Sequence, residues 1–181
     1  MGHRRELDML LIENDNEYKK VCIWKDEVPF KCVEQNTMHM SVESGDINWH
    51  IGVICIEVKL HPRHISNYAM VHMKYINNEK NKTNIIINLG KENISYKSRV
   101  LPFNKAISVG LNKEFADAIY EFFKENSHGK LPSIEILGGG YDDVGSSNVA
   151  FKKTMELLMF IFQHIDNLSD DELQCELLKL I

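Results

Sequence analysis

The chain has 181 residues, of which 44% are hydrophobic and 26% charged, a balance typical of one globular domain of ordinary size. Its apolar runs are far shorter than the roughly 18 residues that a membrane-spanning helix needs, and the N-terminus lacks the apolar segment of a secretory signal. The net charge of −5 is not that of a dedicated RNA-binding protein, and the four cysteines have no C-x-x-C spacing. We therefore expect a cytoplasmic protein with reduced cysteines and no membrane contact.

The first half of the chain is predicted to form strands. Residues 1–17 are polar and acidic, and we expect this N-terminal segment to be flexible. Beyond it, β-branched and alternating apolar residues predict strands within 18–42, at 49–60, at 68–76 and at 85–89. The stretch 90–97 has no clear pattern and is taken as a connection.

The second half changes to a helical period after Pro102. Apolar residues at 111, 115, 119 and 122 share one helical face, and Gly129 ends that helix. A strand is predicted at 133–137, and Gly138–Gly140 then open a predicted loop. A second helix is predicted at 149–165, and the capping box Ser169-Asp-Asp-Glu begins a short C-terminal helix.

These elements predict an α+β fold, with a mostly antiparallel sheet and helices on one face. We divide the chain into a flexible N-terminus at 1–17, one domain at 18–166 and a C-terminal amphipathic helix at 167–181. Residues 52–105 carry nine basic and three acidic residues. This basic segment is either a surface that faces a polyanion or a solvated strand face.

The most informative segment is the junction between the predicted strand at 133–137 and the second helix. It reads as a glycine-led loop, an aromatic, two carboxylates, a turn glycine and a serine that can cap a helix. Its order resembles a signature of the fourth domain of translation elongation factor G, Gly-x-Tyr-x-Asp-Val-Asp-Ser-Ser followed by Ala-Phe-Lys. The matching residues here are Gly139, Tyr141, Asp143, Val144, Ser146, Ser147, Ala150, Phe151 and Lys152.

A second segment is similar to relatives of that factor. Residues 47–53, followed by 58–60, look like the strand with Trp and Ile-Gly in the tetracycline-resistance ribosomal protection proteins. The resemblance covers about residues 20–165. It implies a four-stranded, mostly antiparallel sheet with a left-handed β-α-β crossover, the fold of the second domain of ribosomal protein S-five.

The resemblance also implies a function. In the family this loop forms the tip of the domain and enters the decoding region of the small ribosomal subunit. We therefore expect a non-catalytic, translation-related module that binds ribosome or structured RNA through the loop 138–147. The RNA- or partner-binding candidates are Gly139, Gly140, Tyr141, Asp142, Asp143, Val144, Ser146, Ser147, Trp49 and His50.

Two positions depart from the family pattern, because Asp142 stands where the family has histidine or a similar residue and Gly145 replaces its second aspartate. A carboxylate at this position makes contact with RNA phosphates less favourable. The chain also lacks the G-x-x-x-x-G-K-[ST] loop, so we expect no nucleotide bound by that mechanism and no cofactor.

Other chemistry is weighed against simpler interpretations. His61 and His64 are a candidate pair of metal ligands, with His50 and His72 as candidates to complete the site. The usual zinc spacing is absent, and a polar turn explains the pair at 61 and 64 more simply. Asp142 and Asp143 are acid/base or cation-binding candidates, although neighbouring loop residues rarely share one proton. Ser146 and Ser147 lack a nucleophile elbow and suit a helix cap, whereas Trp49 and His50 suit either base stacking or a strand-end contact.

Three hypotheses follow. The first is the RNA- or ribosome-binding module. The second is a protein-interaction or regulatory module with the same fold, which the substitutions at 142 and 145 and the acidic C-terminal helix favour. The third is a small enzyme, which requires the histidines or the two aspartates to converge in one pocket.

Overall fold

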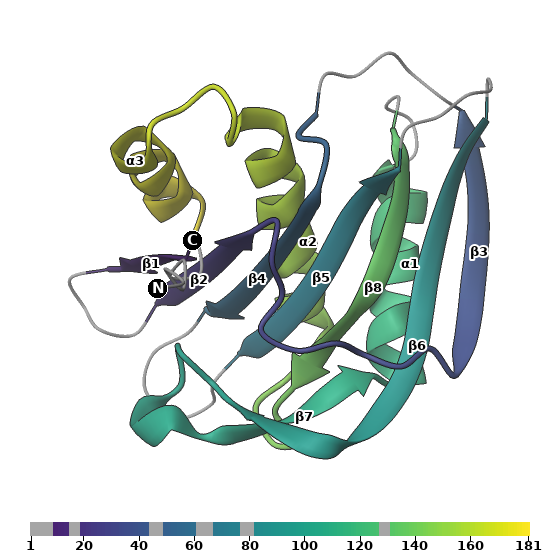
Figure 1. Cartoon of the computed structure of the whole chain (residues 1–181), viewed down its shortest axis with the longest axis horizontal. Coiled ribbons are helices and arrows are strands. Elements are labelled where there is room, and N and C mark those ends of the chain that lie inside the picture. Colours follow the sequence, from purple (N-terminus) through teal and green to yellow (C-terminus); the bar gives the residue numbers. More distant parts are fainter. Residues whose placement is uncertain (1–8, 15–18, 44–48, 61–66, 77–81, 127–130) are drawn as a thin grey trace, which may run out of the picture.

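The computed structural model describes residues 9–14, 19–43, 49–60, 67–76, 82–126 and 131–181. Within these ranges the chain forms eight strands, three helices and one short 3-10 turn, η1 (Figure 1). In chain order they are β1 (Met9–Glu13), β2 (Lys20–Lys25), β3 (Asn36–Glu43), β4 (Val53–Lys59), β5 (Tyr68–Ile76), β6 (Lys82–Lys97), η1 (Pro102–Asn104), β7 (Ala106–Leu111), α1 (Lys113–Asn126), β8 (Ser133–Tyr141), α2 (Asn148–His164) and α3 (Asp170–Leu180).

The strands form one mostly antiparallel sheet in the order β1-β2-β4-β5-β8-β7-β6-β3, which confirms the predicted α+β class. The parallel ladder among the described strands joins β6 to β8 over residues 85–87 and 134–136. The expectation of four strands is wrong, since the described residues contribute eight. β7 directly precedes α1 and pairs antiparallel with β8. The strand that runs parallel to β8 is β6, which comes before β7 in the chain.

The main core lies between the sheet and its helices, which cover one face (Figure 1). Alternation along β4 directs Ile54, Ile56 and Val58 toward this layer. The rings of Phe115 in α1 and Phe151 in α2 stack with centroids 4.4 Å apart, which joins the two helices. Each large apolar side chain buried here stabilises the fold by about 1.5–3 kcal/mol.

A second, smaller core covers part of the opposite face. It contains Trp24, Cys55, Tyr68 and Met70, among others. The connection from β2 to β3 crosses in front of the sheet in Figure 1 and packs Phe30 on this cluster. The turn that precedes β7 adds further apolar side chains, so both faces of the central strands are covered.

Several predicted elements agree with the structure. β5 spans 68–76 as predicted, and α2 begins after Ser147, whose side chain accepts a hydrogen bond from the backbone of Ala150. Ser169 and Glu172 form the predicted capping box at the start of α3.

Other expectations are corrected. Gly138–Gly140 belong to β8, not to a loop, and residues 90–97 continue β6. Residues 106–111 form β7, which was not predicted, and residues 9–13, inside the segment expected to be flexible, form β1.

All four cysteines lie in the described residues and are free thiols, as predicted. Burial raises the pKa of Cys55 far above its usual range, so this thiol is unreactive. Among the helices that the structure describes, none has the length and apolar character to cross a bilayer.

Candidate functional site

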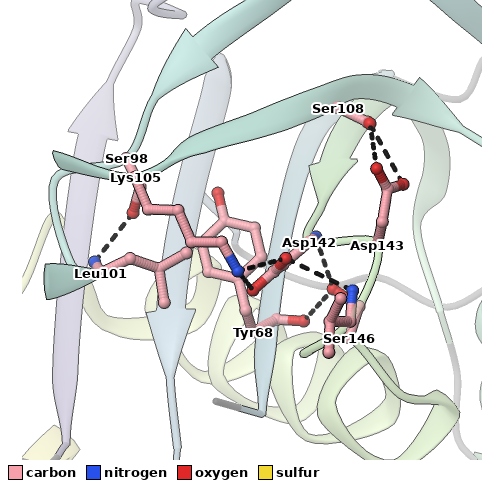
Figure 2. Close-up of polar contacts among 9 residues, drawn as sticks. Tyr68, Ser98, Leu101, Lys105, Ser108, Asp142, Asp143 and Ser146 are labelled. Carbon is pink, nitrogen blue, oxygen red and sulfur yellow. Dashed lines mark hydrogen bonds and ion pairs between the residues drawn. The ribbon is translucent and has the colours of Figure 1, made fainter. Parts of the chain in front are cut away.

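The loop between β8 and α2, residues 142–147, is a turn held by hydrogen bonds and is called the tip loop below. The backbone N–H of Asp142 donates to Ser146 Oγ at 2.9 Å, and that hydroxyl donates to the carbonyl of Tyr68 at 2.7 Å (Figure 2). The N–H of Tyr68 in turn donates to the carbonyl of Gly145 at 3.1 Å. Ser146 therefore ties the tip loop to β5, while Ser147 caps α2.

An ion pair fixes the first carboxylate of the tip loop. Asp142 is only 4% exposed, and Lys105 Nζ lies 2.8 and 2.7 Å from its two oxygens. Lys105 comes from the turn before β7 and reaches across to Asp142 in Figure 2. This contact compensates the charge of Asp142. It also holds Lys105 in place, so Asp142 anchors the turn before β7.

The second carboxylate points elsewhere. Asp143 is exposed and accepts from Ser108 Oγ at 3.2 Å, away from the pair between Lys105 and Asp142 (Figure 2). The two aspartates therefore hold different partners and do not share a proton. A hollow of about 360 Å³ lies beside them, and its lining consists of Ile94, Ser95, Lys105, Ala106, Ile107, Ser108, Asp142, Asp143 and Val144.

Large apolar side chains are exposed around this hollow and on η1. Phe103 is fully exposed, Val144 is 85% exposed and Ile94 is 54% exposed. Phe103 also adopts φ 57° and ψ 26°, a left-handed conformation that is unfavourable for a bulky residue. We call these three residues and the hollow the tip surface.

A buried carboxylate on the sheet holds the turn that carries η1. Glu57 is fully buried and accepts from Tyr68 Oη at 2.9 Å and from the backbone N–H of Arg99 at 3.0 Å. Burial raises the pKa of Glu57, and hydrogen bonds from Ser98, Arg99 and Tyr68 oppose that rise. Glu57 therefore anchors one end of the segment 98–105, and Asp142 anchors the other.

The remaining predicted site residues lie at the other end of α2. Trp49 is buried with its ring centroid 6.1 Å from that of Phe162, and the backbone N–H of His50 donates to the carbonyl of Phe162. Since α2 has 17 residues, its two ends are about 25 Å apart. Trp49 and His50 are therefore not brought together with the tip loop.

His50 is held between two carboxylates. Its Nδ1 lies 2.8 Å from Asp166 Oδ2, and its Nε2 lies 3.0 Å from Asp26 Oδ1. The pKa of Asp166 is lowered mainly by a hydrogen bond from Lys25, and a hydrogen bond from His50 adds to this effect. These contacts tie the end of β2 to the end of α2, and they occupy both ring nitrogens of His50.

The other metal-ligand candidates are not brought together within the described residues. His61 and His64 lie outside the described residues, and His72 is buried under Phe30 with ring centroids 4.8 Å apart. No group of three histidine, cysteine or acidic side chains in the described ranges is arranged to hold a metal ion.

Within the predicted binding set, Gly139, Gly140 and Tyr141 are buried in β8. Asp143 and Val144 are exposed on the tip loop, and Ser146 and Ser147 hold its backbone. Sequence reasoning missed Phe103 and Ile94. A proline before Phe103 signals a turn, but nothing in the sequence shows that the ring faces solvent.

Comparison of the chain with family models, with curated proteins and with solved structures finds no match.

Proposed function

We propose that this chain is a cytoplasmic, non-catalytic binding module that docks on a protein partner through the tip surface. The observation that carries the proposal is Phe103, a fully exposed aromatic side chain on a backbone with φ 57°. A non-glycine residue in this conformation costs about 1–3 kcal/mol. Inside the chain the exposed ring gives no burial energy in return, whereas contact with a partner would bury it.

The composition of the tip surface suits a protein interface, and Phe103 lies two residues before Lys105, which lines the hollow. Such interfaces are dominated by a few aromatic anchors with polar groups at the rim. Val144 and Ile94 add exposed apolar area, and Ser108 and Asp143 provide polar groups beside the hollow. Because the tip loop and the segment 98–105 are fixed by internal hydrogen bonds, little ordering would be needed on binding.

An RNA or ribosomal partner is the second candidate. It is favoured by Lys97 and Arg99, which are exposed next to η1, and by the resemblance to the fourth domain of elongation factor G. The parallel pairing of β6 with β8, with α1 between them in sequence, supports proposing a β-α-β crossover, and the left hand of that crossover is proposed from the resemblance alone. Two observations argue against an RNA partner. Lys105 is already paired with Asp142, and the exposed Asp143 would repel phosphates.

A non-catalytic role is supported by the separation of the chemical groups. Asp142 and Asp143 bind different partners, and Ser146 donates its hydroxyl proton to a backbone carbonyl. His50 lies at the far end of α2 between two carboxylates. These side chains supply no adjacent nucleophile and base.

A comparative pull-down tests the proposal. The bait is the full chain, and the tip variant is the double substitution F103S/V144S. The matched control is Ile51→Ser, which changes a residue of similar exposure next to His50. All three baits are incubated with extract from the source cells, with and without nuclease and at two salt concentrations, and captured proteins are identified by mass spectrometry.

We expect one protein that the wild type and the Ile51 variant capture equally and that the tip variant loses at least tenfold. A partner retained by the tip variant would contradict the assignment of the binding surface. Capture that disappears with nuclease and weakens steeply with salt would instead support the RNA candidate. Circular dichroism of each bait checks that the substitutions leave the fold intact.

A further inference from the structure

β3 is an edge strand of the sheet that the described residues form. It is the last strand in the sheet order, and within the described residues it pairs with β6 alone. Eight successive residue pairs join β3 to β6, from Asn36 with Leu89 to Glu43 with Lys82, without a bulge. β3 is the outermost strand beside β6 in Figure 1. Its outer backbone N–H and C=O groups therefore form a regular row that another strand can pair with.

The helix-facing side of β3 is apolar and incompletely covered. Met38, Met40 and Val42 pack against the main core but remain half-buried. The nearest helix, α1, packs on the neighbouring strand β6. A strand added beyond β3 would bury the outer parts of these side chains.

Seven of the eight residues of this edge strand are of types that do not block strand addition, and Glu43 at its end is the exception. Residues 36–42 contain no lysine, arginine, aspartate, glutamate or proline. Natural edge strands are commonly protected by such residues, by bulges or by short length. The opposite edge shows that protection, because β1 has five residues and α3 packs against it.

We propose that β3 pairs antiparallel with β3 of a second copy of this chain, around a two-fold axis at Met40. In this register Met40 faces Met40, Met38 faces Val42 and His39 faces Ser41. Residues that face each other in an antiparallel pair point to the same side of the sheet. The helices of both copies therefore lie on one side, and six half-buried apolar side chains form a continuous strip between them.

Side-chain chemistry favours this register over its neighbours. A shift by two residues in one direction would set His39 against His39, and a shift by one would set apolar side chains against polar ones. The pairing uses none of the tip-surface residues, so it does not depend on the proposed function.

Cysteine cross-linking tests the register. Met40→Cys is made in a chain that also carries Cys175→Ser, because Cys175 is exposed. Across the two-fold axis the Cα atoms of the two substituted residues would be roughly 4.5–5.5 Å apart, which suits a disulfide. The matched control is Val42→Cys, whose counterpart would lie four residues further along, roughly 13 Å away.

We expect mild oxidation to link the Met40 variant into a dimer at least tenfold faster than the Val42 variant on non-reducing gels. Equal rates would indicate random collisions and overturn the proposal, as would no linkage of the Met40 variant. If a His39→Cys variant linked faster than the Met40 variant, the proposed register would be wrong.

Sedimentation under reducing conditions measures the association without cross-linking. At roughly 100 µM, where a micromolar dimer would be well populated, the wild type should sediment as a dimer and dissociate on dilution. Met40→Lys sets two cations against each other across the axis, and this variant should sediment as a monomer. Circular dichroism should show that it is folded. Leu11→Lys on β1 is the matched control and should stay dimeric, whereas a monomeric wild type would contradict the proposal.

Discussion

His72 should make this protein sensitive to acid. It lies on β5 with 1% of its surface exposed, faces Cys55 on β4 and Gly138 on β8, and is covered by Phe30. Its Nε2 atom is buried without a hydrogen-bond partner. Burial in this apolar environment lowers the pKa of His72 to about 3. The folded protein therefore holds this imidazole neutral.

The sign and size of the effect follow from proton linkage. In the unfolded chain the His72 pKa is 6.5, so below that pH the unfolded state binds a proton that the folded state refuses until about pH 3. Stability is therefore lost as the pH falls through this window, by about 1.36 kcal/mol per pH unit. At pH 4.5, two units below the unfolded pKa, the loss is roughly 2.7 kcal/mol.

Urea unfolding of the wild type and of His72→Leu, at pH values from 7.5 to 4.5, measures this loss. At pH 7.5 the two free energies of unfolding should agree within about 1 kcal/mol, because leucine is of similar size and Nε2 makes no hydrogen bond. At pH 4.5 the variant should be more stable by roughly 2–3 kcal/mol. The raised pKa of Glu57 acts in the opposite direction, but both proteins share it. Parallel curves would refute the reasoning.

Three further predictions concern the tip loop and the strand that leads to it, each measured as a change in the free energy of unfolding. Lys105→Met should cost about 1–3 kcal/mol, because Asp142 is left buried without its cation, and adding Asp142→Asn should recover part of the loss. Gly138→Ala should cost about 1–3 kcal/mol, since φ is 142° and the new Cβ would lie 2.4 Å from Cys32 Sγ. Adding Cys32→Ala should relieve only the part of the clash that Sγ causes, because Cys32 Cβ would still lie 2.6 Å from the new Cβ, and full recovery would contradict the backbone argument. Ser147→Ala should cost about 1 kcal/mol through the lost helix cap, and an unchanged midpoint would contradict its role.

Elements with a complete local signal could be predicted from the sequence. The apolar stripe of α2 and the box of Ser169 with Glu172 depend on neighbouring residues in one turn or one face. The alternation of β5 likewise needs only its own nine residues. In each case the local pattern and the final packing favour the same structure.

Elements that depend on distant partners could not be predicted in this way. Glycine disfavours strands, so Gly138–Gly140 were expected in a loop. In the structure, side chains at these positions would collide with Cys32, the Met70 carbonyl and Ile107. The glycines are therefore needed because other parts of the chain approach β8 closely, and no local pattern reports this approach.

At the candidate site, the burial of Glu57 likewise could not be predicted from its local sequence. Alternation places it on the face opposite Ile56 and Val58, where a carboxylate is normally solvated. Its burial arises because the segment 98–105 folds over the sheet and donates the N–H of Arg99 to it. The burial of a polar residue by a segment more than 40 positions away has no signal in its own strand.

The same segment links the buried network to the proposed binding surface. Its first end is held by Glu57 through Arg99, and its last residue, Lys105, is held by Asp142. Phe103 lies between these anchors on a left-handed backbone that a free loop would not keep. The acidic residue that departs from the elongation-factor signature thus has a structural use here, since Asp142 fixes the turn that presents Phe103. In the proposed function, this arrangement suits an apolar partner surface better than a phosphate backbone, because Lys105 is already paired with Asp142.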